Sequence, residues 1–113
     1  MAEQILGTAS YYDNSSVDPR WGGATKSGEQ FNENLPTVAV APNRWKELKG
    51  KKVRVTNTKN GKSVVVKVND TGGFEKYGRV ADLSKSAFAS IEDTKKGTAK
   101  VRIDVLENLL GNN

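Results

Sequence analysis

The segment Asn60–Ser84, NGKSVVVKVNDTGGFEKYGRVADLS, decides the fold, because it contains a strand, a glycine-rich loop and a second short apolar run. Alternate residues of the first strand are apolar and suited to one buried face: Val64, Val66 and Val68. We expect this strand to span Lys62–Asn69 and Asp70 to lie in the loop after it, held by a stiff element. The second run, Arg79–Leu83, contains Asp82. The sequence therefore predicts that two carboxylates converge on one groove.

Further short strands are expected on both sides of this segment. They span Ile5–Tyr12, Thr37–Ala41, Lys52–Thr58 and Thr98–Leu106, with a long loop over Asp13–Pro36. Six strands without the spacing of βαβ units predict an all-β closed barrel. At 113 residues, the chain is expected to form one domain over residues 1–113.

Local signals predict the turns and helices. Asn60 and Gly61 favour a hairpin, because both residues tolerate positive φ. A helical turn is expected over Pro42–Leu48. Ser84 is expected to cap a second helix that runs through Ile91. The predicted core contains Val53, Val55, Val64, Val66, Val68, Leu83, Phe88, Val101, Ile103 and Val105.

Composition restricts the chemistry. The chain has no cysteine and no histidine, which removes the usual general base, the Ser-His and Cys-His nucleophiles and the commonest zinc ligand. Acid–base chemistry must use carboxylates, lysine or tyrosine, and we expect no metal and no cofactor. No apolar run approaches the roughly 20 residues of a membrane span.

The net charge of +5 favours acidic partners such as wall polymers, although solubility alone explains it equally well. The densest basic stretch, Lys46–Arg54, has only Trp45 as a nearby aromatic residue. Nucleic-acid modules usually add stacked aromatics to such a stripe, so we expect no nucleic-acid partner.

Six segments match one known family in order: Gly7–Tyr12 (GTASYY), Ala24–Asn32 (ATKSGEQFN), Val53–Asn57 (VRVTN), Asn60–Gly61, Val68–Asp70 (VND) with Gly72 and Phe74, and Gly78–Arg79 with Asp82–Ser84 (DLS). Nearly the whole chain thus resembles the double-psi β-barrel domain of the bacterial rare lipoprotein A group. Members of that group include peptidoglycan lytic transglycosylases, and expansins and family-45 endoglucanases are more distant relatives. The resemblance implies a small six-stranded double-psi β-barrel with one or two short helices.

The resemblance also implies three catalytic candidates. Asp70 matches the Val-Asn-Asp element of the family and is the first choice for the catalytic acid; the alternative is an aspartate that only shapes its turn. Asp82 matches an Asp-Leu-Ser element whose aspartate faces the groove, and its alternative role is helix capping. Glu29 matches the Asn-Gly-Glu-x-Phe loop beside the catalytic aspartate, and its alternative is an ordinary solvated residue.

Substrate contacts are expected from residues in or beside the matched segments: Tyr11, Tyr12, Asp13, Thr25, Phe31, Asn69, Phe74 and Arg79. The aromatic residues would be sugar platforms, although an aromatic on a strand face is more often core. Asp13 stands where family-45 enzymes have a catalytic base, and a strand-ending turn aspartate is the alternative.

Several family residues are replaced in this chain. The usual Asn-Asp-Arg-Gly-Pro-Phe reads Asn69–Phe74, NDTGGF, so the arginine and the proline are gone. The family histidine after the second strand falls at Val40, and the aspartate after the loop phenylalanine is Asn32. These departures leave room for a different glycan or for no catalysis.

The leading hypothesis is a domain that cleaves wall glycan in the manner of a peptidoglycan lytic transglycosylase. Two alternatives remain open: an expansin-like module that binds glycan without cutting it, and an inhibitor of papain-type proteases. The expected partner is peptidoglycan or another wall polysaccharide, or a cysteine protease in the last case, and we expect a monomer. Met1–Leu6 does not read as a signal peptide. An extracellular or periplasmic location is expected, with export by a removed signal or by another route such as a phage particle.

Overall fold

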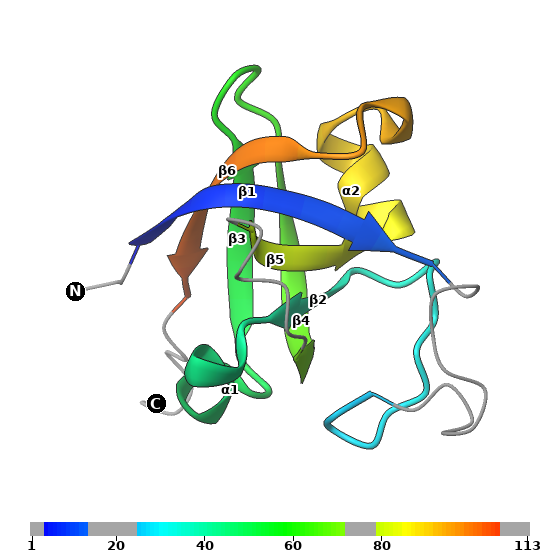
Figure 1. Cartoon of the computed structure of the whole chain (residues 1–113), viewed down its shortest axis with the longest axis vertical. Helices are drawn as coiled ribbons and strands as arrows, with labels where there is room; N and C mark the ends of the chain where they lie inside the picture. The colour runs from blue at the N-terminus through cyan, green and yellow to red at the C-terminus, as the bar shows by residue number, and fades with distance from the viewer. Residues whose placement is uncertain (1–3, 14–24, 72–78, 107–113) are drawn as a thin grey trace.

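Six strands close into a barrel in the computed structural model, which describes residues 4–13, 25–71 and 79–106. The strands pair in the order β1-β5-β2-β4-β3-β6 (Figure 1). They are β1 (Gln4–Tyr12), β2 (Thr37–Val40), β3 (Lys52–Asn57), β4 (Ser63–Thr71), β5 (Arg79–Ser84) and β6 (Ala99–Val105). The all-β barrel predicted from the sequence is confirmed.

The barrel is mixed, because β1 pairs with β5 and β2 pairs with β4 in parallel, while the remaining pairs are antiparallel. The predicted β3–β4 hairpin is present. Its turn differs from the expectation: within the described residues no residue other than glycine has positive φ, and Gly61 alone in this loop adopts it, at 79°. The side chain of Asn60 instead accepts the backbone N–H of Lys62 at 2.8 Å.

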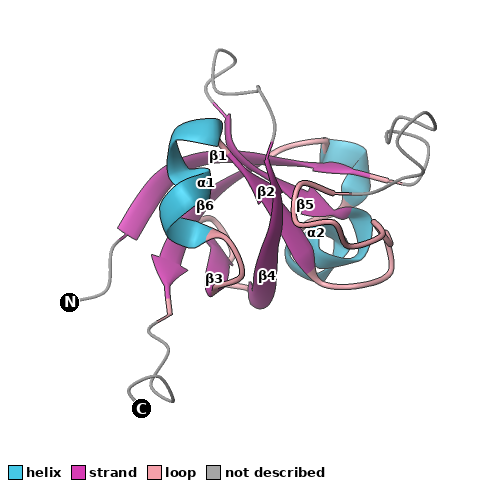
Figure 2. Cartoon of the chain, turned by 90° about the horizontal axis from the view of Figure 1, so that it is seen from below, coloured by secondary structure: helices cyan, strands magenta, loops and turns pink. Residues whose placement is uncertain are grey.

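Two short α-helices of the described residues lie on opposite sides of the barrel, as both views of the chain show (Figure 1, Figure 2), and a 3-10 helix, η4 (Thr94–Lys96), follows the second. Helix α1 (Pro42–Leu48) begins at a proline, whose fixed φ suits the first helical position, and buries Leu48. Helix α2 (Lys85–Ile91) buries Ala87, Phe88 and Ile91. No helix in the described ranges is long and apolar enough to cross a membrane.

Ser84 stands at the N-cap position of α2, but its hydroxyl does not cap the helix. The hydroxyl donates to the carbonyl of Leu35 at 2.5 Å and accepts the N–H of Thr37 at 3.2 Å. The predicted N-cap position of Ser84 is therefore confirmed, but the predicted hydrogen bond from its side chain to the helix is absent. The buried hydroxyl thus forms hydrogen bonds with two backbone groups at the entrance to β2.

Strand β4 continues to Thr71, two residues beyond its predicted end at Asn69, so Asp70 belongs to the strand and not to a loop. The reason is parallel pairing with β2, which places Ala39 opposite Asp70 and Val40 opposite Thr71. The Thr71 hydroxyl also donates to the carbonyl of Val40 at 2.7 Å. Pairing with a distant segment thus holds Asp70 within the strand, directly after a register shift between Val38 and Ala39 that leaves Asn69 without a register partner on β2.

The core is close to the predicted one. Val64 and Val105 are only partly buried and pack against its margin, whereas the other predicted core residues are buried. Within β4, Val66 is 1% exposed and its neighbour Val65 is 41% exposed. Two adjacent valines thus lie on opposite faces of the strand, with Val66 facing the core and Val65 facing solvent.

We expect Val66→Ala to lower the free energy of unfolding by about 2 kcal/mol, because it removes buried methyl groups and leaves a cavity. The matched change Val65→Ala removes the same atoms from an exposed position, and its effect should stay below about 0.5 kcal/mol. Urea unfolding of both variants measures the difference. Equal losses would mean that the two faces are assigned wrongly.

Candidate functional site

The two predicted aspartates lie on the two strands that flank β2. Ala39 of β2 is the register partner of Asp82 on β5 and of Asp70 on β4. On β1, Ser10 is the register partner of Asp82. These residues form one row across four strands. With strands about 4.8 Å apart, the two aspartate Cα atoms are separated by about 10 Å.

The Asp70 carboxylate is fixed through both of its oxygens. Oδ2 accepts a hydrogen bond from the Tyr12 hydroxyl at 3.1 Å. Oδ1 accepts the backbone N–H groups of Lys26 and Thr71, each at 2.9 Å. Because the donors come from β1, β4 and a separate turn, the carboxyl orientation is set by tertiary structure.

Tyr12 links Asp70 to an aromatic stack. The centroid of its ring lies 4.2 Å from the centroid of the Phe31 ring, and the angle between the two ring planes is 22°. Burial raises the pKa of the Tyr12 hydroxyl well above its ordinary value, and the nearby negative charges of Asp70 and Asp82 raise it further. The phenol therefore remains a donor to Asp70. Phe31 is itself buried, so its ring is not an open sugar platform.

Asp82 belongs to a second small network. The Ser10 hydroxyl donates to Asp82 Oδ1, and Arg79 Nη1 donates to Ser10 Oγ at 2.8 Å. Arg79 Nη1 also lies 3.8 Å from Asp82 Oδ1, which makes an ion pair. Helix α2 has no acidic residue in its first turn, so the capping role considered for Asp82 is not what the structure shows.

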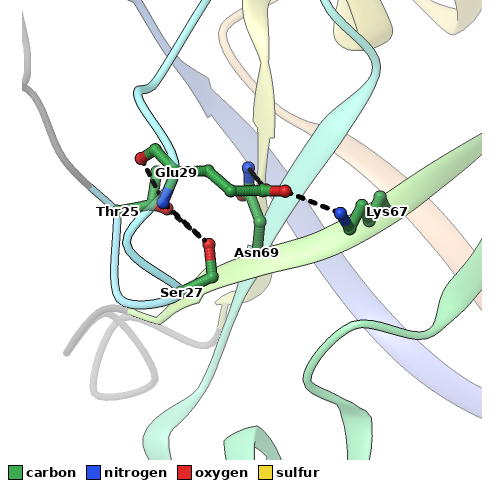
Figure 3. A network of polar contacts seen from close by, with 5 residues as sticks. All are labelled: Thr25, Ser27, Glu29, Lys67 and Asn69. Atoms are coloured by element: carbon green, nitrogen blue, oxygen red, sulfur yellow. Dashed lines mark hydrogen bonds and ion pairs between the residues drawn. The ribbon is translucent and has the colours of Figure 1, made fainter.

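Glu29 is held in a third network, drawn in Figure 3. Lys67 Nζ lies 2.6 Å from Glu29 Oε2, and Asn69 Nδ2 donates to Oε1 at 3.1 Å. The Lys67 hydrogen bond, followed by that from Asn69, lowers the pKa of Glu29 below its usual range. Glu29 is therefore a fixed negative charge near neutral pH.

Residues 25–29, called here the 25–29 turn, carry Glu29 to this position. The Thr25 hydroxyl donates to the carbonyl of Glu29 at 3.0 Å and contacts the Ser27 hydroxyl at 2.9 Å (Figure 3). The Ser27 N–H bonds to the carbonyl of Asn69 at 3.1 Å. Thr25 is thus buried within the turn and shapes it, while Ser27 ties the turn to β4.

Two grooves include residues of the 25–29 turn in their walls. The first, the Glu29 groove, has a volume of about 340 Å³ and is lined by residues that include Glu29, Leu35, Thr37, Lys67 and Asn69. The second, the Trp45 groove, has a volume of about 380 Å³ and is lined by Lys26, Ser27, Trp45, Lys49 and Gly50. Both grooves thus adjoin the strand end that carries Asp70.

The other predicted residues are distributed differently. Tyr11 contacts the ring of Phe88 at 4.9 Å and donates to the carbonyl of Thr94, so it packs toward α2 and not toward Asp70. Asp13 directly follows β1, and Phe74 lies outside the described residues. In the described ranges, no three Asp, Glu, His or Cys side chains gather as a metal site requires.

Two functional neighbours were not predicted. Ser10 bridges Asp82 and Arg79, and Lys67 neutralises Glu29. The period of two along a strand could have pointed to them, because Ser10 is two residues from Tyr12 and Lys67 is two residues from Asn69, and residues two apart share a strand face. Their partners, however, come from distant segments.

The replaced family positions have new roles here. Val40, at the position of the family histidine, is a buried core residue. Asn32, at the position of the family aspartate, accepts the N–H of Asn34 at 2.9 Å. Within the described residues, neither position supplies an ionisable group to the Asp70 region.

Solved structures with the same barrel include a Streptomyces papain inhibitor, with a TM-score of 0.74 at 20% identity over 93% of this chain and 96% of that one. Another is a point mutant of a Clavibacter michiganensis expansin in complex with cellohexaose, with a TM-score of 0.71 at 20% identity. That match covers 94% of this chain and 52% of the expansin. At such identities these likenesses establish the fold alone.

Sequence relatives are closer. A probable endolytic peptidoglycan transglycosylase RlpA of Nostoc is 45% identical over 88% of this chain and 25% of its own length. The endolytic peptidoglycan transglycosylase RlpA of Neisseria meningitidis serogroup A is 42% identical over 74% of this chain and 33% of its own. The chain thus spans a quarter to a third of these relatives. The lytic transglycolase family model matches residues 4–103, and the chain therefore belongs to this family of double-psi β-barrel domains.

Proposed function

We propose that this domain cleaves peptidoglycan glycan strands as a lytic transglycosylase, with Asp70 as the general acid. One observation supports the assignment: among the three candidate acids, Asp70 alone has no cationic side chain within ion-pair distance in the described residues, and its hydrogen bonds come from a phenol and two backbone N–H groups. Glu29 is paired with Lys67, and Asp82 is paired with Arg79. The similarity to endolytic transglycosylases over most of the chain supports the substrate class.

The proposed reaction uses one carboxyl group twice. The protonated Asp70 gives its proton to the glycosidic oxygen as the bond to the anomeric carbon breaks and positive charge develops on the sugar. The 6-hydroxyl of the same muramic acid then attacks the anomeric carbon, and its proton passes to the Asp70 carboxylate. The proton is thereby restored, and the product is a 1,6-anhydro sugar. No activated water is required.

The neighbouring groups would prepare this carboxyl. Tyr12 holds Oδ2 while the Lys26 N–H holds Oδ1, so the group is oriented before the substrate arrives. The carboxylates of Glu29 and Asp82 are already paired with Lys67 and Arg79, so we assign them no direct part in the proton transfer. With such a substrate, the domain would act at the cell wall, outside the cytoplasm.

An expansin-like module that binds glycan without cleavage is the second candidate. It is favoured by Val40, which fills the core at the position where the family has an ionisable histidine. Product analysis separates the two: release of anhydro-muropeptides from sacculi indicates cleavage, and retention on sacculi without products indicates binding alone. The inhibitor of papain-type proteases, the third hypothesis, is supported only by the shared fold.

Asp70→Asn should lower the rate of anhydro-muropeptide release from purified sacculi by at least about 100-fold, because the transferable proton is lost. The amide oxygen can still accept the N–H groups of Lys26 and Thr71, so the free energy of unfolding should change by less than about 1 kcal/mol. Mass spectrometry of the released products measures the rate.

The matched control is Asp104→Asn, on β6, where the carboxylate contacts Gln4 and Arg102. This variant should keep the wild-type rate. A folded Asp70→Asn protein with full activity would overturn the assignment of the acid.

Glu29→Gln should lower the rate less than Asp70→Asn does and should leave the shape of the pH profile unchanged over roughly pH 5 to 8. The reason is that Lys67 and Asn69 lower the pKa of Glu29, so this carboxyl stays ionised throughout the range. Initial rates of product release across this range test the expectation. A profile that loses its acidic limb in Glu29→Gln would assign the titrating group to Glu29.

A further inference from the structure

Two lysines line the Trp45 groove. Lys26 and Lys49 line it together with Trp45, and neither ammonium group has a carboxylate within ion-pair distance in the part of the chain that the structure describes. In the Glu29 groove, by contrast, Lys67 is neutralised by Glu29 at 2.6 Å. The two grooves beside the 25–29 turn therefore differ in charge.

The walls of the Trp45 groove are tied to the strand end that carries Asp70. The N–H of Lys26 bonds to Asp70 Oδ1. The N–H of Gly50, which also lines the groove, bonds to the carbonyl of Val68 at 2.9 Å. A ligand in this groove would consequently lie beside the end of β4 that carries the proposed acid.

Trp45 supplies the apolar surface of the groove. It is partly buried and packs against the core, which restricts the movement of its ring. An indole ring offers a large flat surface for the C–H face of a sugar at low cost in side-chain entropy. The groove thus combines a platform for a ring with two ammonium groups for an anion.

We propose that the Trp45 groove is a subsite for a sugar ring that bears a carboxylate, with the ring on Trp45 and the carboxylate between Lys26 and Lys49. The inference rests on the proposed function, because it takes the occupant to be part of the glycan strand that reaches Asp70. A muramic acid residue has such a carboxylate on its lactyl group when no peptide is attached. The subsite would select which sugar of the strand lies beside the acid.

A phosphate-rich wall polymer offers the same negative charge without a ring for Trp45. The sugar carboxylate is favoured because the groove adjoins Asp70 and contains an aromatic platform. Polyglycerol phosphate is therefore included as a separate ligand in the test.

The test uses the Asp70→Asn protein, so that binding is measured without cleavage. A tetrasaccharide of alternating N-acetylglucosamine and N-acetylmuramic acid with free carboxylates is compared with its methyl amide derivative by NMR titration. The free acid should bind about 5- to 10-fold more tightly at low salt, which corresponds to one or two exposed ion pairs. The preference should shrink at high salt. The amide signals of Ser27 and Gly50 should shift with both ligands.

Three substitutions assign the preference to residues. The double change Lys26→Gln and Lys49→Gln should bring the ratio of the two dissociation constants close to one. Trp45→Ala should weaken both tetrasaccharides by similar factors. Lys46→Gln, on the same helix as Trp45 but outside the groove lining, should keep the wild-type ratio.

Equal affinity for the free acid and the methyl amide would overturn the proposal. A Lys46→Gln variant whose ratio of dissociation constants falls as far as that of the double variant would also overturn it. If only amide signals of residues in the Glu29 groove shift, the ligand binds there and not in the Trp45 groove, and the proposal is overturned. Polyglycerol phosphate binding as tightly as the free acid would exclude recognition of the ring. Cleavage by the wild-type chain is measured separately on sacculi, so loss of the transglycosylase assignment would leave the binding result interpretable.

Discussion

The rest of the structure depends on the insertion of β2 between β4 and β5. This strand has only four residues, all buried, and it pairs in parallel on one side and antiparallel on the other. Its two ladders close the barrel and also set Asp70 and Asp82 on either side of Ala39. The geometry of the two aspartates is therefore a property of backbone hydrogen bonding, which is more precise than placement on loops.

The three candidate acids have two kinds of partner, and the difference gives Asp70 a different chemistry from the other two. Glu29 and Asp82 lie beside cations, so they are negative charges that the fold has already compensated. Asp70 instead meets a phenol whose pKa is raised by burial and by the acids themselves, together with backbone N–H groups. The arrangement keeps one carboxyl oriented without neutralising it by a salt bridge.

Alternating apolar residues and short apolar runs predicted the strands and most of the core, because both are local properties of the sequence. The number of strands, without the spacing of βαβ units, predicted the barrel. These patterns did not predict that Asp70 lies within β4, since the extension depends on pairing with β2. The Ser10, Arg79 and Asp82 network was equally inaccessible, because its hydrogen bonds join residues 69 and 72 positions apart. The Ser84 hydroxyl was misassigned for the same reason: a local capping rule competed with a carbonyl from a distant loop.

Asp70 also serves as an anchor, because its Oδ1 receives the N–H of Lys26 and so fastens the 25–29 turn to β4. Selection on the shape of this surface would preserve the aspartate even in a descendant that no longer cuts glycan. Retention of this residue among barrels of the same kind is consequently weak evidence of activity. The groups that distinguish a working enzyme from a binding descendant should be sought among residues that have no structural duty of their own.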